Sequence, residues 1–252
     1  MINYKVCDPS GNITILVTTE VPNEKRIEVA DELMKKEPTA QQVGYISEDS
    51  EGCDIELNMA GGEFCGNATL STAALYKQSH TDVDTVHVKA SSAKDVISVS
   101  ISDAEGIYYA TAKMPKPDDY YEKTLKYNNK DYRVFLVDFG EMIHLVMIDP
   151  LNKEDIEPAI KEWYKVFKRS ALGIMSYEES ISALTPAVLS NNGDFFCYES
   201  SCASGTTALA IYLAERDKSE IEKKINEPGG VLTISAKPGG EVVLSNTIRI
   251  KE

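Results

Sequence analysis

Two cysteines occupy matching contexts, 137 positions apart in the chain. Cys65 lies within "GGEFCGNATLSTAALY" and Cys202 within "ESSCASGTTALAIYL". In both stretches the cysteine is followed by small residues and then by an Ala- and Thr-rich run that is typical of a helix. We therefore predict helices over 66–78 and 203–216, each with a cysteine at its N-terminus.

The N-terminus of a helix is a favourable place for a reactive cysteine. Its unpaired backbone N–H groups and the positive end of the helix dipole stabilise an anion by ~0.3 to 1 kcal/mol. Small residues let a ligand approach those amides closely. A cysteine there can have its thiol pKa lowered from about 8.5 to between roughly 3.5 and 7.5. The sequence therefore predicts, in each half of the chain, an anion-binding helix N-terminus beside a proton-transfer group.

Two such groups on opposite sides of one small cleft would favour inversion of a stereogenic carbon. One thiolate would remove the proton from that carbon, and the opposite thiol would deliver a proton to the other face. The helix ends would stabilise the negative charge that develops on a substrate carboxylate. We expect no cofactor for this chemistry.

Other roles for the cysteines have to be weighed as well. A free cysteine is most often an inert, buried, small hydrophobic residue, and we assign that role to Cys7, Cys53 and Cys197. A redox disulfide between Cys65 and Cys202 is an alternative that the sequence leaves open. The five cysteines lack CxxC spacing and the three histidines are widely separated, so no metal site is predicted.

Charge limits the classes of partner. The chain has 26 Lys and Arg against 40 Asp and Glu, a net charge of -14, which disfavours nucleic acid and anionic membrane surfaces. No signal-like segment and no apolar run of about eighteen residues is present, so we expect a cytoplasmic protein. The expected partner is a small molecule. The oligomeric state stays open, with a homodimer as one option.

The surrounding elements predict a duplication. Each half has a strand, a small-residue turn with a cysteine, a helix and a hairpin, which implies two similar domains related by a pseudo-twofold axis. The stretch 112–119, with two prolines, suits a linker. A further helix is expected over 153–170, with Pro158 either in its first turn or breaking it.

The motifs "GGEFCGNA" and "SSCASGTTA" resemble the two cysteine motifs of the diaminopimelate epimerase fold, a group of amino-acid racemases and epimerases that work without pyridoxal phosphate. The resemblance covers nearly the whole chain. It implies an α+β protein of two pseudo-symmetric domains, each a curved, mostly antiparallel sheet around a central helix, with the active site in the cleft between them. The implied domains are 1–117 and 118–245, with the final strand, 246–252, returning to the first domain.

The resemblance also implies roles for individual residues. Cys65 and Cys202 correspond to the two catalytic bases. The other implied site residues contact the substrate: backbone groups cradle its α-carboxylate, polar side chains bind it, and an acidic residue holds its α-ammonium. They are Asn12, Gln42, Asn58, Gly66, Asn67, Glu199, Ser200, Ala203, Ser204 and Gly205. No metal ligand is implied.

Departures from the diaminopimelate epimerase pattern bear on the substrate. Those enzymes follow the glutamate with an arginine that binds a distal carboxylate, whereas here Ser200 follows Glu199. The family's "GNPH" becomes "GEMIH", which places Glu141 near His144. A pocket that has lost a cation and gained an acid suits a neutral or basic side chain.

The same features are similar to the histidine racemases, and we expect a cofactor-independent histidine racemase. PhzF-type isomerases share the architecture without the cysteine pair, so the two cysteines argue against that branch. Diaminopimelate epimerase is one alternative. A non-catalytic amino-acid-binding or thiol-sensing protein is another.

Overall fold

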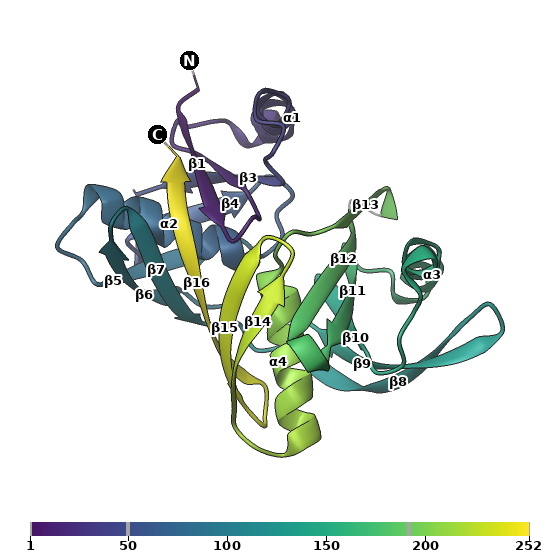
Figure 1. Ribbon diagram of the computed structural model, residues 1–252. Helices are drawn as coiled ribbons and strands as arrows, with labels where there is room; N and C mark the ends of the chain where they lie inside the picture. The colour runs from purple at the N-terminus through teal and green to yellow at the C-terminus, as the bar shows by residue number, and fades with distance from the viewer. Residues whose placement is uncertain (1, 49–50, 191–192, 252) are drawn as a thin grey trace. The chain divides into compact units, whose positions relative to one another are not determined.

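The computed structural model describes residues 2–48, 51–190 and 193–251. The chain divides into two compact units, one of Met1–Pro115 with Val243–Glu252 and one of Lys116–Val242 (Figure 1). The sequence predicts the corresponding boundaries after residues 117 and 245. Among the helices of the described ranges, none combines the length and the apolar character needed to cross a bilayer.

The first unit is built from strands around one helix, with a second helix outside. Its elements are β1 (Tyr4–Pro9), β2 (Thr14–Val17), a 3-10 turn (Asn23–Lys25), α1 (Arg26–Lys36), β3 (Gln42–Ser47), β4 (Ile55–Met59), α2 (Gly66–Ser79), β5 (Thr85–Ala90), β6 (Ile97–Ala104), β7 (Ile107–Lys113) and most of β16 (Glu241–Lys251).

The strands of the first unit form a closed barrel. Each of β1 to β6 pairs with the next strand, and β16 pairs antiparallel with both β7 and β1. Figure 1 shows β16 running between those two strands. The pairs β2–β3 and β4–β5 are parallel because a helical crossover joins each of them. Closure removes the free edges of the sheet.

Helix α2 fills the barrel. It contacts β1, β2, β4, β5, β6 and β7, and every residue from Gly66 to Leu75 is buried. A helix surrounded by strands can have no polar face, and the narrow space favours Gly, Ala, Ser and Thr. The outer helix α1 instead buries one stripe, with Ala30 and Leu33 packed on a cluster that includes Ile15, Val43 and Tyr45.

The second unit is an open sheet with a helix on each face. Its elements are β8 (Asp119–Tyr127), β9 (Lys130–Asp138), β10 (Met142–Met147), α3 (Lys153–Phe167), β11 (Ala171–Glu178), a 3-10 turn (Glu179–Ile181), β12 (Ala183–Ser190), β13 (Phe195–Tyr198), α4 (Ala203–Asp217), β14 (Ile221–Glu227) and β15 (Gly230–Lys237). The strands pair in the order β8–β9–β10–β11–β12–β14–β15, with β13 added to β12.

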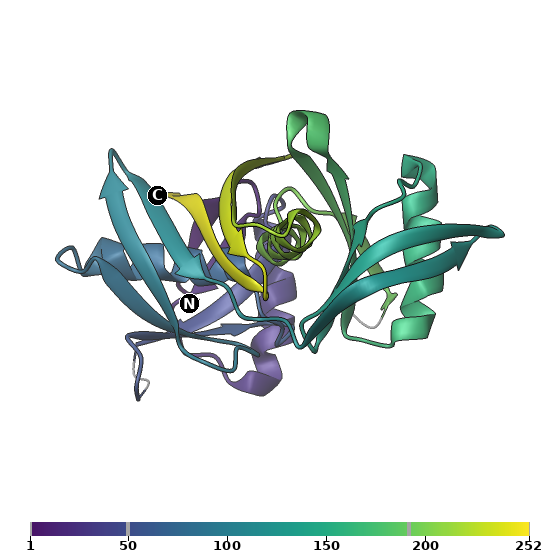
Figure 2. The ribbon, with the colours of Figure 1, turned by 90° about the horizontal axis from the view of Figure 1, so that it is seen from below.

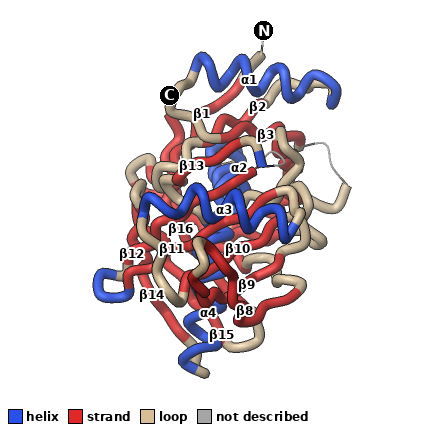
Figure 3. The backbone as a smooth tube through the Cα atoms, turned by 90° about the vertical axis from the view of Figure 1, so that its right-hand side faces the viewer, coloured by secondary structure: helices blue, strands red, loops and turns tan. Residues whose placement is uncertain are grey.

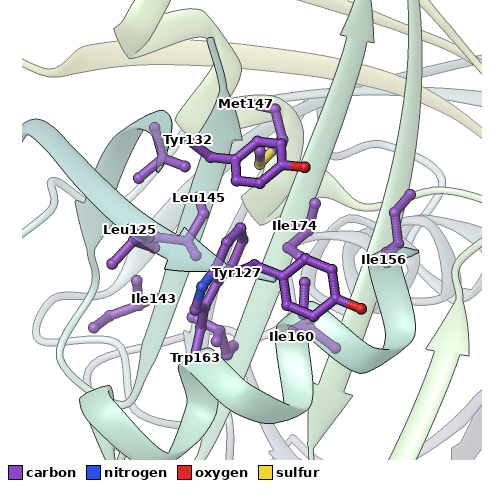
Figure 4. Packing of buried hydrophobic residues seen from close by; sticks show 14 of the residues in the cluster. Leu125, Tyr127, Tyr132, Ile143, Leu145, Met147, Ile156, Ile160, Trp163 and Ile174 are labelled. Atoms are coloured by element: carbon purple, nitrogen blue, oxygen red, sulfur yellow. The ribbon is translucent and has the colours of Figure 1, made fainter. Parts of the chain in front are cut away.

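Successive side chains along each strand point to opposite faces of this sheet. Leu145 and Ile174 point to α3, where Trp163 and Ile160 complete a buried cluster (Figure 4). Figure 3 shows α3 lying across these strands. The intervening residues of β10 and β11 point to the opposite face, where α4 contacts β10, β11, β14 and β15. In Figure 2 the view runs close to the axis of α4, with β14 and β15 beside it.

Each unit follows the same internal connection order. The order begins with an antiparallel pair of strands, β1–β2 or β9–β10. A helix then leads from the second strand to a third that lies parallel to it, β3 or β11. This third strand pairs antiparallel with the next one, β4 or β12. A second helix, α2 or α4, then crosses to another parallel partner, followed by an antiparallel hairpin. The predicted helices over 66–78 and 203–216 are confirmed as α2 and α4.

The expectation for Pro158 was wrong. It is the sixth residue of α3, and the helix continues through it to Phe167. The carbonyl that loses its partner belongs to Glu154, in the first turn. Both residues are exposed, so that carbonyl is open to hydration and the missing hydrogen bond does not end the helix.

Candidate active site

Cys65 caps α2 with its sulfur. Its backbone is extended, with φ -128°, and Sγ accepts a hydrogen bond from the Ala68 amide at 3.4 Å. The Cys65 carbonyl accepts from the hydroxyl of Thr69 at 2.8 Å and from its amide at 3.0 Å. The thiol therefore stands where a serine or aspartate oxygen usually satisfies the first helical amides.

Cys202 caps α4 in the same way. Its φ is -134°, and Sγ accepts from the Gly205 amide at 3.3 Å. The Cys202 carbonyl accepts from both the hydroxyl and the amide of Thr206, each at 2.8 Å. The two units thus present a cysteine sulfur at a helix N-terminus with one shared geometry, including the threonine four residues later.

Gly205 is required by the crowding around the Cys202 sulfur. A Cβ at this position would lie 2.2 Å from Sδ of Met175 and 3.1 Å from Sγ of Cys202. Met175 is fully buried, so it has little room to move away. The glycine therefore lets the helix amide reach the sulfur while Met175 packs behind it.

The two thiols differ in their surroundings. Cys202 is only 6% exposed, whereas Cys65 is half-buried, and both are free thiols. Burial, followed by the negative charges of Glu199 and Glu227, raises the pKa of the Cys202 thiol well above its usual value. The thiol also hydrogen-bonds to Glu199. The expected lowering of the thiol pKa by the helix end was therefore wrong for Cys202, because burial and two acids oppose it.

A buried histidine lies behind the second cysteine. Nε2 of His144 is 2.9 Å from Oγ of Ser204, and that hydroxyl is 3.6 Å from Sγ of Cys202. Burial lowers the pKa of His144 to about 3, so the ring is neutral. Nδ1 of His144 is buried without a hydrogen-bond partner in the described part of the chain. Gly173 makes room for the ring, since a Cβ there would lie 2.2 Å from Nδ1.

Glu227 belongs to the site, and the sequence did not single it out. Its carboxylate accepts from the Cys202 amide at 2.6 Å and from the hydroxyl of Thr206. The side chain of Ser201 is a third partner. The signal in the sequence is an acid at a position where β14 alternation points inward, after Ile221 and Ile225.

Polar side chains of the first unit form two networks. Gln42 donates through Nε2 to Oδ1 of Asn12 at 2.5 Å and to Thr14 at 2.8 Å. Asn12 is buried and donates to Gln41 at 2.8 Å. The structure thus brings together Asn12 and Gln42, which the resemblance implied as site residues.

The second network joins α2 to the end of the chain. Asn246 of β16 donates to Oδ1 of Asn67 at 3.1 Å and accepts from the Ser10 hydroxyl at 2.5 Å. Asn246 and Asn67 are both buried. The sequence missed Asn246, because its contact partners are far away along the chain.

The remaining implied residues are placed as follows. Asn58 lies half-buried in β4, and Gly66 is the buried first residue of α2. Ala203 opens α4, and the Ser200 carbonyl accepts from the Gly229 amide at 2.7 Å. Glu141 is exposed and accepts from the Ser170 hydroxyl at 2.7 Å, so its role beside the substrate stays a prediction.

Comparison with known proteins gives the family. A family model described as the histidine racemase CntK N-terminal domain matches residues 1–251. The chain belongs to this family. It is therefore an isomerase, a racemase, and the alternative of a non-catalytic protein is set aside.

The histidine racemase family includes two similar relatives from different bacteria. The histidine racemase of Fusobacterium nucleatum subsp. nucleatum (strain ATCC 25586) is 32% identical over 243 residues, covering 92% of this chain and 88% of the relative. That of Staphylococcus aureus (strain Mu50) is 26% identical over 246 residues, covering 94% and 89%.

Solved structures support the fold. A predicted epimerase from Pseudomonas aeruginosa has a TM-score of 0.74 at 12% identity, covering 100% of this chain and 98% of its own. A protein described as of the phenazine biosynthesis PhzC/PhzF type, from Clostridium difficile, has a TM-score of 0.64 at 13% identity, with the same coverage. The chain therefore has the fold of racemases and epimerases that work without pyridoxal phosphate, a mixed sheet that includes a barrel, with helices.

Clustered metal ligands are not a feature of this site. Across residues 2–48, 51–190 and 193–251, no group of three or more His, Cys, Asp or Glu side chains is placed to hold a metal ion.

Proposed function

We propose that this member of the histidine racemase family racemises free histidine with Cys65 and Cys202 as its two bases. The observation that carries this assignment is the repeated cap, in which each sulfur accepts a helix amide, at 3.4 Å from Ala68 and at 3.3 Å from Gly205. A structural cysteine needs no such placement, and two of them in one geometry support a shared chemical task.

The proposed reaction moves one proton at each step. A thiolate takes the α-proton of histidine, and the electron pair left on the α-carbon delocalises into the carboxylate. The thiol on the opposite face then donates its proton to that carbon, which inverts the centre and leaves the second sulfur as thiolate. This mechanism requires that the two sulfurs reach one α-carbon from opposite sides, in a cleft between pseudo-symmetric domains.

The helix ends would hold the substrate carboxylate. The first amides of α2, at Gly66 and Asn67, and of α4, at Ala203 and Ser204, precede the amides that bond to the sulfurs. Donors of this kind stabilise the charge that develops on the carboxylate when the α-carbon loses its proton, by several kcal/mol in enzymes with comparable sites. We assign Asn12, Gln42, Asn58, Glu199, Ser200 and Gly205 to supporting contacts, as the resemblance implies.

His144 and Ser204 form a chain of hydrogen bonds that ends at the Cys202 sulfur. The neutral ring at 2.9 Å can accept from the Ser204 hydroxyl, which then presents an oxygen to the Cys202 thiol. Burial and the charges of Glu199 and Glu227 raise the pKa of the Cys202 thiol, and the Ser204 hydrogen bond opposes that rise only in part. We propose that Cys202 is the thiol in the resting enzyme and donates the proton when Cys65 removes one.

Histidine is proposed because both compared relatives are named histidine racemases. The scheme uses no cofactor. The proposed partner is this small molecule, since a net charge of -14 opposes binding to nucleic acid or anionic membranes, and a homodimer stays an option. The proposed location is the cytoplasm.

A chiral chromatographic screen of the common amino acids and diaminopimelate tests the substrate. We expect conversion of L- and D-histidine toward an equal mixture, with slower or no conversion of diaminopimelate. Faster conversion of diaminopimelate than of histidine would contradict the assignment, and so would an absence of conversion across the screen.

Matched variants test the two bases. Cys65→Ala and Cys202→Ala should each lower the racemisation rate by roughly a thousandfold or more, within the range for a lost general acid or base. Cys53→Ala is the control, because Cys53 is another half-buried cysteine and takes no part in the proposed reaction. Racemisation by either alanine variant at the rate of the Cys53→Ala control would remove that residue from the mechanism.

A further inference from the structure

The two cysteine motifs differ at one buried position. The residue 25 places after the cysteine is Ala90 in the first unit and Glu227 in the second. Each is the last residue of the strand that follows the capped helix, β5 or β14. Ala90 is 5% exposed and Glu227 is 8% exposed. The two units therefore have equivalent buried positions at the end of β5 and of β14, and only the second unit has an acidic residue there.

Glu227 holds the N-terminal turn of α4 through several contacts. One carboxylate oxygen accepts from the Cys202 amide at 2.6 Å, the other contacts the Thr206 hydroxyl, and Ser201 bonds to the same carboxylate. In a capping box, a glutamate in the first turn of the helix accepts a hydrogen bond from the N-cap amide. Here the glutamate that accepts from the N-cap amide comes from a strand instead. The Cys202 backbone is therefore tied to β14 as well as to its own helix.

The groups that face this carboxylate explain its effect on the sulfur. Glu199, from the loop before α4, acts on both Glu227 and Cys202 as a second negative charge. Thr206 and Ser201 supply hydroxyls, and Ser204 supplies a hydroxyl to the sulfur. A thiolate at Cys202 would add another negative charge to a buried site that already holds two acids, which is unfavourable.

We propose that Glu227 is a positioning residue that fixes Cys202 at the mouth of α4 and keeps the proton on its sulfur. The role in racemisation rests on the proposed function. The surroundings of the two cysteines then differ, because the first unit has Ala90 at the position that Glu227 has in the second. Cys202 is the sulfur that holds a proton in the resting enzyme.

The hydrogen bonds around Thr206 allow two proton states of Glu227. The Thr206 hydroxyl has one proton, and its oxygen lies 2.8 Å from the Cys202 carbonyl as well as beside Glu227. When Glu227 is ionised, Thr206 can donate to it. When Glu227 is protonated, it can donate to Thr206, which donates to the carbonyl. Burial raises the pKa of Glu227 to about 7, so both states are available near neutral pH.

The alkylation rate of the Cys202 thiol tests this coupling directly. The protein would be treated with iodoacetamide at pH 8, and each cysteine followed by peptide mass spectrometry. In Glu227→Gln, which keeps the size but removes the charge, we expect Cys202 to react about three- to tenfold faster, because its thiolate fraction rises. Glu222→Gln, at an exposed position of the same strand, should leave the rate unchanged. An unchanged or slower Cys202 rate in Glu227→Gln would overturn the inference.

Two internal reporters separate this effect from unfolding. Cys7 is fully buried and should stay unreactive, and Cys53 should keep its wild-type rate. If Glu227→Gln exposes Cys7, Glu227→Asp takes its place, since it keeps the charge. Slow, wild-type-like alkylation of Cys202 in Glu227→Asp would support the inference, and fast alkylation in that folded variant would overturn it.

Failure of the inference can be told apart from failure of the proposed function. Alkylation needs no histidine, so its outcome stands even if the wild-type enzyme does not racemise histidine. Conversely, racemisation of histidine by the wild type with an unaltered Cys202 rate in Glu227→Gln would overturn only the role of Glu227. A shift of the pH–rate profile of racemisation in Glu227→Gln, absent in Glu222→Gln, would add support.

Discussion

The imidazole of His144 lies 2.9 Å, through Nε2, from the hydroxyl of Ser204, the second residue of α4. The strand β10 presents this ring to the face of the sheet where α4 packs, and Gly173 of the neighbouring strand leaves it space. A buried ring held in this way acts as a neutral hydrogen-bond partner. Its contact with Ser204 therefore links the sheet to the residue that faces the Cys202 sulfur.

The neutral state of His144 can be measured by NMR. Burial lowers its pKa to about 3, against 6.5 for an unperturbed histidine, because the charged ring would be desolvated. We expect the His144 ring signals of protein labelled with ¹⁵N-histidine to stay constant between pH 8 and pH 5. His144→Asn identifies the signals by their disappearance. A titration of His144 with a midpoint between pH 6 and 7 would show that the ring is accessible and would contradict the account.

Gly205→Ala tests the crowding at the Cys202 sulfur. The added methyl would overlap Met175, which is fully buried, so we expect a loss of roughly 1 to 3 kcal/mol in the free energy of unfolding. Racemisation should fall as well, because the Gly205 amide and the sulfur are pushed apart. Urea unfolding and chiral chromatography measure the two effects.

The reciprocal control for this variant comes from the first unit. Ala68 has the place that Gly205 has in the second, since its amide bonds to the Cys65 sulfur. Ala68→Gly should cost only about 0.5 to 1 kcal/mol, the usual penalty for glycine in a helix. By helix propensity alone Gly205→Ala would gain a similar amount, so a Gly205→Ala protein as stable as the wild type, or more stable, would contradict the crowding at Met175.

Glu227 makes a testable contribution to stability that depends on pH. Its pKa is raised from 4.5 to about 7 by burial, so the folded protein binds the proton more tightly than the unfolded chain. The stabilisation is therefore complete below pH 4.5 and is lost as the pH rises through 7. Relative to Glu227→Gln, the wild type should lose roughly 3 kcal/mol in the free energy of unfolding between pH 4.5 and pH 8.

Urea unfolding at several pH values would measure this difference, with Glu222→Gln as the control for removal of a carboxyl group. Parallel pH dependences of wild type and Glu227→Gln would indicate that Glu227 titrates normally in the folded protein. That result would contradict the burial of Glu227 beside the charge of Glu199.

The capped helices were predictable because their signals are local. The Ala- and Thr-rich run after each cysteine indicates a helix from a few neighbouring residues alone. Strands β8 and β14 are harder to predict, for the opposite reason. In β8 few residues are buried, and in β14 charged or polar residues occupy the exposed alternate positions, so neither shows an apolar run. The turn between β8 and β9, with Asn128 and Asn129 at φ 48° and 59°, is a hairpin signal that could have found β8.

The site was only partly predictable. Cys65, Cys202 and their neighbours repeat as a pattern, which the sequence shows directly. Glu227 and Asn246 do not, because each lies on a strand and meets its partner at a helix N-terminus 25 or 179 residues away, Glu227 at Cys202 and Asn246 at Asn67. The protonated state of Cys202 depends on burial next to two acids, which no spacing in the sequence reports.

The exchange of the α-hydrogen in heavy water tests the two-base reaction most directly. Wild-type enzyme would be incubated with L-histidine in D₂O, and both enantiomers recovered at low conversion for mass spectrometry. We predict that the D-histidine formed carries deuterium at the α-carbon while the remaining L-histidine keeps its protium, because different sulfurs remove and deliver the proton. Equal deuterium in both enantiomers from the earliest time would indicate a single base, and racemisation without deuterium in the product would equally contradict the account.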